Sequence, residues 1–159
     1  MLAQAFPPLY GDSPGILILG TFPSPLSRER GEYYGNPRNQ FWRLLFGVFD
    51  LPYDRPDYAQ KKSVLFANGV ALWDVITACE PEGALDSGIR NPVYNTGLPA
   101  FIENHKINRV LFNGNNAYMF YRRNIGTIER HVLPSSSPAN ARLPFEGKLK
   151  QWQGAMLSG

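Results

Sequence analysis

The sequence predicts an α/β layer fold with a mainly parallel sheet. Four short apolar runs are rich in branched residues and bounded by glycine, asparagine or proline, which is typical of strands buried on both faces. Segments with helical periodicity or helix start and stop signals lie between these runs, so strands and helices alternate along the chain. In such folds a ligand binds in the crevice beyond the carboxyl ends of the strands.

The first half of the chain begins with a predicted strand over residues 15–20, followed by an irregular stretch over 21–38. Apolar residues then recur at helical spacing over 41–48, directly after Asn39, a residue type that caps helices. A second helix is predicted over 56–67, because Asn68-Gly69 is a typical stop signal. The buried run over 70–76 is the second predicted strand.

The second half of the chain continues the same alternation. Its predicted elements are a loop over 80–95, a helix over 98–104, a strand over 109–113, a helix from Asn115 or Asn116 to about residue 123, a strand over 130–133 and a last helix over 146–156. Four segments therefore follow strand ends and are candidates for a site: 21–39, 74–91, 113–116 and 134–142.

Composition is consistent with one folded domain over residues 1–159. Hydrophobic residues make up 43% of the chain, enough for a real core, whereas charged residues make up only 18%, below the roughly 25% of an average domain. The 15 glycines, 14 prolines and 13% aromatic residues predict long loops that carry rings. Such loops usually serve binding sites.

The small numbers of cysteines and histidines exclude several kinds of site. One cysteine, Cys79, excludes an intramolecular disulfide framework, a four-cysteine zinc site and a four-cysteine iron–sulfur cluster. With only two histidines as well, we expect no metal and no cofactor. Neither a signal peptide nor an apolar run of ~18 residues is present, which predicts a cytoplasmic protein without a membrane partner. The net charge of +3 allows an acidic partner but does not require one.

The first two candidate loops combine backbone donors with aromatic rings. Around Thr21 and Phe22, a glycine and two prolines can aim N–H groups at an oxyanion or an electron-rich ring, although a plain turn is an equal alternative. Tyr34 can stack on a flat heteroaromatic ligand. The Asn39 amide offers an acceptor for a water and a donor for a neighbour, whereas its spacing favours a helix cap.

The other candidates are a lone carboxylate and a serine-rich loop. Asp74 ends an apolar strand, where it can accept an N–H from a ring, cap the next turn or pair with Arg90. The segment over 133–142 offers small hydroxyls and backbone N–H groups that suit phosphate contacts, and its tip can enter a base stack. A surface loop is the alternative that its composition favours.

Six strings, in this order, resemble the uracil-DNA glycosylase superfamily, and within it the hypoxanthine-DNA (deoxyinosine) glycosylase branch. They are LGTFPS at 19–24, YYGNPRNQFW at 33–42, GVALWDV at 69–75, GALDSGI at 83–89, FNG at 112–114 and LPSSSPAN at 133–140. The likeness extends from about residue 16 to 152. It implies a three-layer α/β/α sandwich with a central, mainly parallel four-stranded sheet. It also implies metal-independent hydrolysis of the N-glycosidic bond after base flipping.

The resemblance also implies which residues act. Many relatives carry a catalytic Asp or Asn where this chain has Phe22, and many uracil enzymes carry His where it has Leu133. The hypoxanthine branch uses an asparagine that falls on Asn39, which is therefore the expected catalytic residue. The expected base-binding residues are Thr21, Phe22, Tyr34, Asp74 and Asn113. The expected DNA-binding residues are Ser135, Ser136, Ser137, Asn140 and Arg142, with Asn140 or Arg142 filling the gap that the flipped base leaves.

The expected protein is thus a monomeric, monofunctional glycosylase associated with the nucleoid. It acts on double- or single-stranded DNA that contains a deaminated base, most of all hypoxanthine. The sequence contains no lysine motif for a Schiff base, which favours a hydrolase over a lyase. Excision of uracil or xanthine by the same fold, and a non-catalytic binder of damaged DNA or of a nucleotide, remain open as alternatives.

Overall fold

A four-stranded parallel sheet lies at the centre of the protein, in a computed structural model that describes residues 1–81, 89–121 and 126–158. Its strands, in spatial order, are β3 (Val70–Asp74), β2 (Ile16–Gly20), β6 (Arg109–Asn113) and β7 (Glu129–Leu133). Every neighbouring pair is parallel, so all four strands end at the same edge. The predicted parallel sheet is therefore confirmed.

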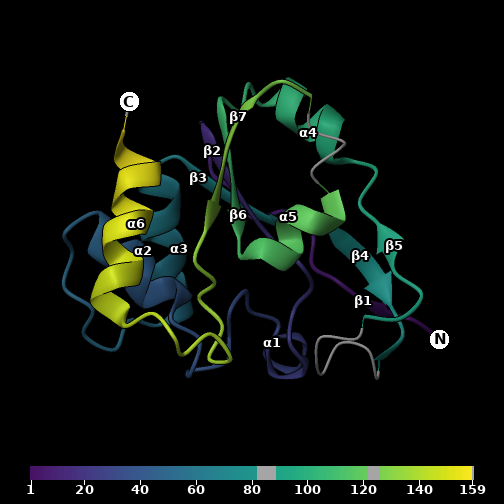
Figure 1. Cartoon of the computed structure of the whole chain (residues 1–159), viewed down its shortest axis with the longest axis horizontal. Coiled ribbons are helices and arrows are strands. Elements are labelled where there is room, and N and C mark those ends of the chain that lie inside the picture. Colours follow the sequence, from purple (N-terminus) through teal and green to yellow (C-terminus); the bar gives the residue numbers. More distant parts are fainter. Residues whose placement is uncertain (82–88, 122–125, 159) are drawn as a thin grey trace.

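Helices cover both faces of this sheet (Figure 1). On β2, Leu17 and Leu19 point into a core shared with α4 (Leu98–Asn104) and α5 (Asn115–Tyr121). Ile18, between them, points into a second core that holds side chains from α2 (Phe41–Val48), α3 (Tyr58–Ala67) and α6 (Phe145–Leu157). A strand whose alternate residues are buried on opposite faces explains the unbroken apolar run. The three-layer α/β/α sandwich is confirmed.

The second predicted strand is in fact two strands in two sheets. β3 ends at Asp74, and β4 (Ile76–Cys79) pairs antiparallel with β1 (Ala3–Gln4) and β5 (Val93–Tyr94) in a small second sheet. The prediction of one strand over 70–76 is wrong: the N–H of Val75 still donates to Gly20 of β2, but its carbonyl accepts the N–H of Asn95, next to β5, so the chain passes from one sheet to the other at Val75. β5 lies in a stretch predicted as loop, and residues 82–88, which hold most of the string at 83–89, lie outside the described residues.

The stretch over 21–38 is less irregular than predicted, because it contains α1 (Pro25–Arg30). The Ser24 hydroxyl accepts the N–H of Ser27, Pro25 occupies the first helical position, and Gly31 ends the helix with φ of 67°. These are a typical start and stop signal. With only 6 residues, α1 is too short for hydrophobic periodicity to reveal it.

The remaining helices begin and end close to their predicted bounds. α3 begins at Tyr58, two residues later than predicted, because Asp57 and Gln60 form a capping box. α6 is one residue longer at each end than predicted, and α4 and β6 match their predicted bounds. The described part of α5 ends at residue 121, so its predicted end near 123 lies outside the described residues.

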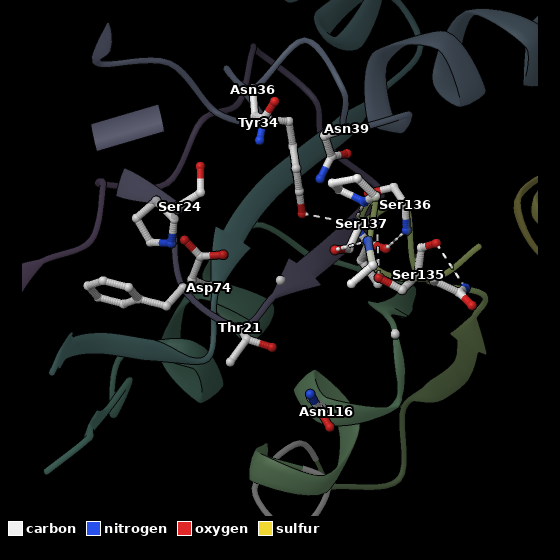
Figure 2. A pocket seen from close by; sticks show the side chains of 18 of the residues that line it. Thr21, Ser24, Tyr34, Asn36, Asn39, Asp74, Asn116, Ser135, Ser136 and Ser137 are labelled. Atoms are coloured by element: carbon white, nitrogen blue, oxygen red, sulfur yellow. Dashed lines mark hydrogen bonds between the residues drawn. The ribbon is translucent and has the colours of Figure 1, made fainter. Parts of the chain in front are cut away.

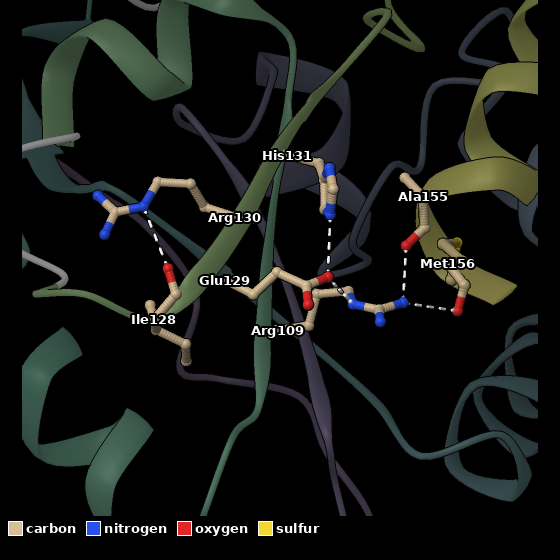
Figure 3. Close-up of polar contacts among 7 residues, drawn as sticks. All are labelled: Arg109, Ile128, Glu129, Arg130, His131, Ala155 and Met156. Atoms are coloured by element: carbon tan, nitrogen blue, oxygen red, sulfur yellow. Dashed lines mark hydrogen bonds and ion pairs between the residues drawn. The ribbon is translucent and has the colours of Figure 1, made fainter. Parts of the chain in front are cut away.

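Arg109 links α6 to the central sheet at the edge opposite the carboxyl ends of the strands (Figure 3). Its Nη1 donates to the carbonyls of Ala155 at 2.9 Å and Met156 at 3.3 Å, in the last turn of α6. Its Nε lies 2.6 Å from Glu129 Oε2, to which His131 Nε2 also comes within 3.0 Å. Cationic side chains stabilise the carbonyl end of a helix, so this cluster joins β6, β7 and α6.

Candidate active site

A cavity of about 920 Å³ opens where the four parallel strands end (Figure 2). Its walls are formed by the segments that follow β2, β6 and β7 and by Asp74, the last residue of β3, at the edge where an α/β fold binds its ligands. Of the candidate segment 74–91, Asp74 alone among the described residues lines the cavity. All of the site residues singled out in the sequence, except Arg142, line this cavity. Residues far apart in sequence are thus brought together at one edge of the sheet.

Asp74 lies at the floor of the cavity with its carboxyl almost completely buried. Its Oδ2 makes no hydrogen bond to any described residue, and no described arginine, Arg90 included, forms an ion pair with it. Burial therefore raises the pKa of Asp74 from 3.8 to about 7. A buried carboxyl without a protein partner is suited to a polar group of a ligand.

Tyr34 forms a wall of the cavity and is held from two sides. Its ring stacks on Phe41, with centroids 4.1 Å apart and an interplanar angle of 13°, so only the opposite ring face remains for a ligand. Its hydroxyl accepts a hydrogen bond from Asn113 Nδ2 at 3.2 Å. Burial, followed by the charge of Asp74, raises the pKa of the Tyr34 phenol, which therefore stays neutral. The neighbouring Tyr33 is a core residue whose hydroxyl donates to the Pro7 carbonyl.

Asn39 caps α2, as its spacing favoured, and the amide oxygen predicted to accept from a water is the atom that the helix uses. Its Oδ1 accepts the N–H of Phe41 at 2.9 Å and so caps the first turn of α2, although the formal cap position is Gln40. Its Nδ2 makes no hydrogen bond to another described residue. Figure 2 shows this nitrogen turned toward the Tyr34 hydroxyl and the cavity, with the oxygen turned away. Because the helix fixes the oxygen, the amide presents a donor at a defined place.

Asn113, at the end of β6, forms hydrogen bonds that link Tyr34 to the serine-rich loop. Its Nδ2 donates to Tyr34 Oη and to Ser136 Oγ, and its Oδ1 accepts the N–H of Ser136 at 3.0 Å. Both of its amide hydrogens are therefore used within the protein. Ser136 is completely buried, and its carbonyl accepts the N–H of Gln40. This pair thus fixes the serine-rich loop against β6 and α2.

The other two serines direct their hydroxyls differently. Ser135 Oγ accepts the N–H of Ser137 at 3.1 Å, and Ser137 Oγ accepts the N–H of Ala139 at 3.2 Å. Each hydroxyl oxygen is thus engaged as an acceptor, which leaves its own hydrogen to donate. Several backbone N–H groups of this loop already donate within the loop or to Asn113. The hydroxyl groups, more than the backbone N–H groups, are therefore the donors that remain for a phosphate.

The supports of this loop were missed by the sequence reasoning. Trp152 Nε1 donates to the Pro134 carbonyl at 2.9 Å, and Lys148 Nζ donates to the Asn140 carbonyl at 2.8 Å. A signal was present, because Lys148, Trp152 and Met156 recur at spacing four and share the buried face of α6. A lysine on such a face is unusual enough to mark a function.

Metal binding and membrane insertion can be checked over the described ranges. These residues contain no group of three or more His, Cys, Asp and Glu side chains that could hold a metal ion. None of the helices in the same ranges is both long and apolar enough to cross a bilayer. Cys79 is a buried, free thiol.

The fold and the cavity define an α/β protein that binds a ligand beyond the ends of its parallel strands. The chain matches the family model of the uracil DNA glycosylase superfamily over residues 7–154, and it belongs to that superfamily. A curated relative from Methanosarcina acetivorans, named hypoxanthine DNA glycosylase, is 36% identical over 96% of this chain and 97% of its own length. A relative of the same name from Methanosarcina barkeri is 37% identical over 89% of this chain and 90% of its own length.

A solved structure supports the same assignment. A solution NMR structure from Methanosarcina acetivorans, assigned by its name to the uracil DNA glycosylases, superposes with a TM-score of 0.82. The two chains are 35% identical, and the match covers 98% of this chain and 97% of the other. The match therefore extends over nearly the whole of both chains.

Proposed function

We propose that the protein is a monofunctional DNA glycosylase that flips hypoxanthine out of DNA and hydrolyses its N-glycosidic bond. Membership of the superfamily and two relatives named hypoxanthine DNA glycosylase support this proposal. The observation that carries it is the Asn39 amide, whose oxygen is fixed by α2 and whose nitrogen faces the cavity. An enzyme needs such a preorganised donor where charge or a nucleophile must be held in place.

Asp74 is proposed to read the base. Hypoxanthine carries an N–H at ring position 1, where adenine, the base from which it arises, has a lone pair. An ionised carboxylate accepts that N–H and repels the adenine lone pair, so the group can distinguish the deaminated base from the normal one. Asp74 lines the cavity that would receive the base, and its buried Oδ2 has no hydrogen bond among the described residues.

Bond cleavage is proposed to be dissociative, through an oxocarbenium-like sugar. The departing base carries the electron pair of the broken bond, and the backbone N–H groups of Thr21 and Phe22 stabilise this charge. Asn39 Nδ2 donates to the oxygen of the water that attacks the sugar carbon. That water leaves its oxygen on the sugar and its proton on the base, so the products are free hypoxanthine and an abasic site.

The test is single-turnover excision from a duplex that contains one hypoxanthine. Asn39→Asp keeps the oxygen for Phe41 N–H and removes the donor, so we expect excision to fall roughly 10²–10³-fold at unchanged thermal stability. Asn39→Ala also removes the helix cap and should cost about 1 kcal/mol of stability. Asn104→Asp, the same change at an exposed residue at the end of α4, is the matched control.

Near-normal excision by Asn39→Ala, which lacks both amide atoms, would show that Asn39 is not the catalytic residue. A covalent complex trapped by borohydride would contradict a hydrolase without a Schiff base. Uracil and xanthine also offer an N–H that Asp74 can accept, so duplexes with either lesion compete in the same assay. Preferred excision of either would overturn hypoxanthine as the main substrate, and binding without turnover on all three would identify a binder.

A further inference from the structure

Lys148 is a buried lysine at the back of the serine-rich loop. Only 2% of the residue is exposed, and its Nζ donates to Gln40 Oε1 and to the Asn140 carbonyl, each at 2.8 Å. Gln40 follows Asn39 directly, and Asn140 closes the loop through hydrogen bonds to Ser135 and Ser137. One ammonium group therefore joins the segment that carries Asn39 to the loop proposed to hold phosphate.

The charge of Lys148 has no anionic partner among the residues that the structure describes. Both acceptors are neutral oxygens, and the ion pairs among the described residues all involve Glu129, on the other side of the fold. Burial lowers the pKa of the Lys148 ammonium, as expected of a cation that loses hydration without gaining a carboxylate. Burying a charge without a counter-charge is costly, and a neutral donor could make the same two hydrogen bonds. This cost indicates that the positive charge itself has a role.

The part of the cavity wall formed by described residues carries no positive side chain. These lining residues include no lysine and no arginine, and Asp74 is the one charged side chain among them. A DNA phosphate held by the hydroxyls of Ser135 and Ser137 would therefore meet no cation in direct contact. Lys148 lies behind this loop in a low-dielectric interior, where charges interact more strongly than in water.

We propose that Lys148 is the buried counter-charge of the DNA phosphate that binds at the serine-rich loop, and the residue that positions this loop against the Asn39 segment. This inference rests on the proposed function, since it needs a DNA substrate. It makes Lys148 a positioning residue rather than a catalytic one, because it acts through Gln40 and Asn140. The phosphate supplies, across the loop, the negative charge that Lys148 lacks among the described residues.

The experiment measures binding to an abasic-site duplex between 50 and 200 mM salt. Lys148→Gln keeps an N–H donor and removes the charge, and Lys148→Met removes both. Lys150→Met is the matched control, because residue 150 lies about 200° further around α6 and is exposed. We expect Lys148→Gln to bind roughly tenfold more weakly and to lower the salt slope by about 1, as Lys148→Met does. Lys150→Met should leave both unchanged.

A second arm places a neutral methylphosphonate at each linkage around the abasic site in turn. At one linkage the neutral group should weaken binding by the wild-type protein roughly tenfold. The same duplex should change the affinity of Lys148→Gln by no more than about twofold. An unchanged salt slope in Lys148→Gln, or equal losses for both proteins at every linkage, would overturn the proposal. Should Lys148→Gln not fold, NMR titration of wild-type Lys148 decides, since its pKa must rise on binding the all-phosphate duplex. Wild-type excision of hypoxanthine tests the proposed function separately.

Discussion

At the scale of single residues, the protonation of Asp74 is the most readily tested property of the site. Its folded-state pKa of about 7 lies above the ordinary 3.8, so the folded state holds this proton more tightly than the unfolded state does. Stability from this group is complete below about pH 4 and is lost as pH rises to about 7. Asp74→Asn removes that loss, so its stability relative to wild type should rise by a few kcal/mol between pH 4 and 8.

Urea denaturation of both proteins at pH 4, 5, 6, 7 and 8 measures this difference. Other titrating groups contribute equally to both proteins and cancel in the comparison. A difference that stays constant over this range would contradict a buried, unpaired carboxyl at position 74. A difference that falls with rising pH would indicate that Asp74 is stabilised as the carboxylate in the folded protein.

Gly20 provides a second residue-scale prediction, because it leaves room for the polar floor of the cavity. A Cβ at this position would lie 2.7 Å from Asp74 Oδ1 and 2.8 Å from the Tyr34 hydroxyl oxygen. Gly20→Ala must displace one of these groups, so we expect excision to fall at least roughly tenfold, a loss that ~1.4 kcal/mol of transition-state stabilisation explains.

The matched control for this substitution is Gly154→Ala in α6. A Cβ there meets nothing within 4 Å, and alanine is the better helix former, so stability should rise by roughly 0.5–1 kcal/mol without a change in excision. Equal activity of Gly20→Ala and wild type would mean that the base does not bind against Asp74 and Tyr34.

Residue types at the site were predictable from the sequence, but their hydrogen bonds were not. Asn39, Asp74 and Tyr34 follow or precede recognisable elements, and the direction of a parallel strand places them at one edge. The stacking of Tyr34 on Phe41 and the use of both Asn113 hydrogens depend on loop conformations. No period or spacing encodes such conformations, because they follow from contacts between distant segments.

At the scale of elements, patterns predicted the four strands of the central sheet, the largely exposed β7 included, and missed the two-residue strands β1 and β5. β2 and β6 are continuous apolar runs, whereas β5 consists of two exposed residues and pairs only at a sheet margin. The division of the run over 70–76 between β3 and β4 was also missed, since both strands are buried and read as one. Tertiary hydrogen bonds at Val75, not local preference, make this break.

The cluster around Arg109 gives an element-scale prediction. Arg109→Met removes two hydrogen bonds to the last turn of α6 and the ion pair with Glu129, so we expect a loss of about 1–3 kcal/mol of stability. Excision at a temperature well below unfolding should be unchanged. The reason is distance: Arg109 begins β6 and Asn113 ends it at the cavity, and four residues of strand span roughly 13 Å.

Chemical denaturation and excision kinetics check this prediction together. Glu129→Gln removes the ion pair and keeps the helix contacts, so it should cost less than Arg109→Met, since Glu129 is half-exposed. A large loss of activity in Arg109→Met at full folding would show that α6 transmits displacements to the serine-rich loop, contrary to our expectation.

At the scale of the whole molecule, low charge is a property of the binding surface as well as of the composition. The net charge is +3, and the cavity lining holds no lysine or arginine within the described ranges. Phosphates would be held by hydroxyls at the surface and by one buried ammonium behind them. Charge alone therefore gave no indication of nucleic acid, whereas the order of the loop strings did.

This surface predicts a shallow salt dependence of DNA binding. Each neutralised phosphate contributes about −0.9 to the slope of log K against log salt, and proteins with 6–10 cationic contacts reach steep values. Because the described residues that line the cavity include no lysine or arginine, and Lys148 is the one cation proposed to face a bound phosphate, we expect a slope of only roughly −1 to −3 for an abasic duplex. Fluorescence anisotropy between 50 and 200 mM salt measures it, with an undamaged duplex as the control. A slope near zero would identify a binder of free bases or nucleotides, and a much steeper slope would require a basic surface remote from the cavity.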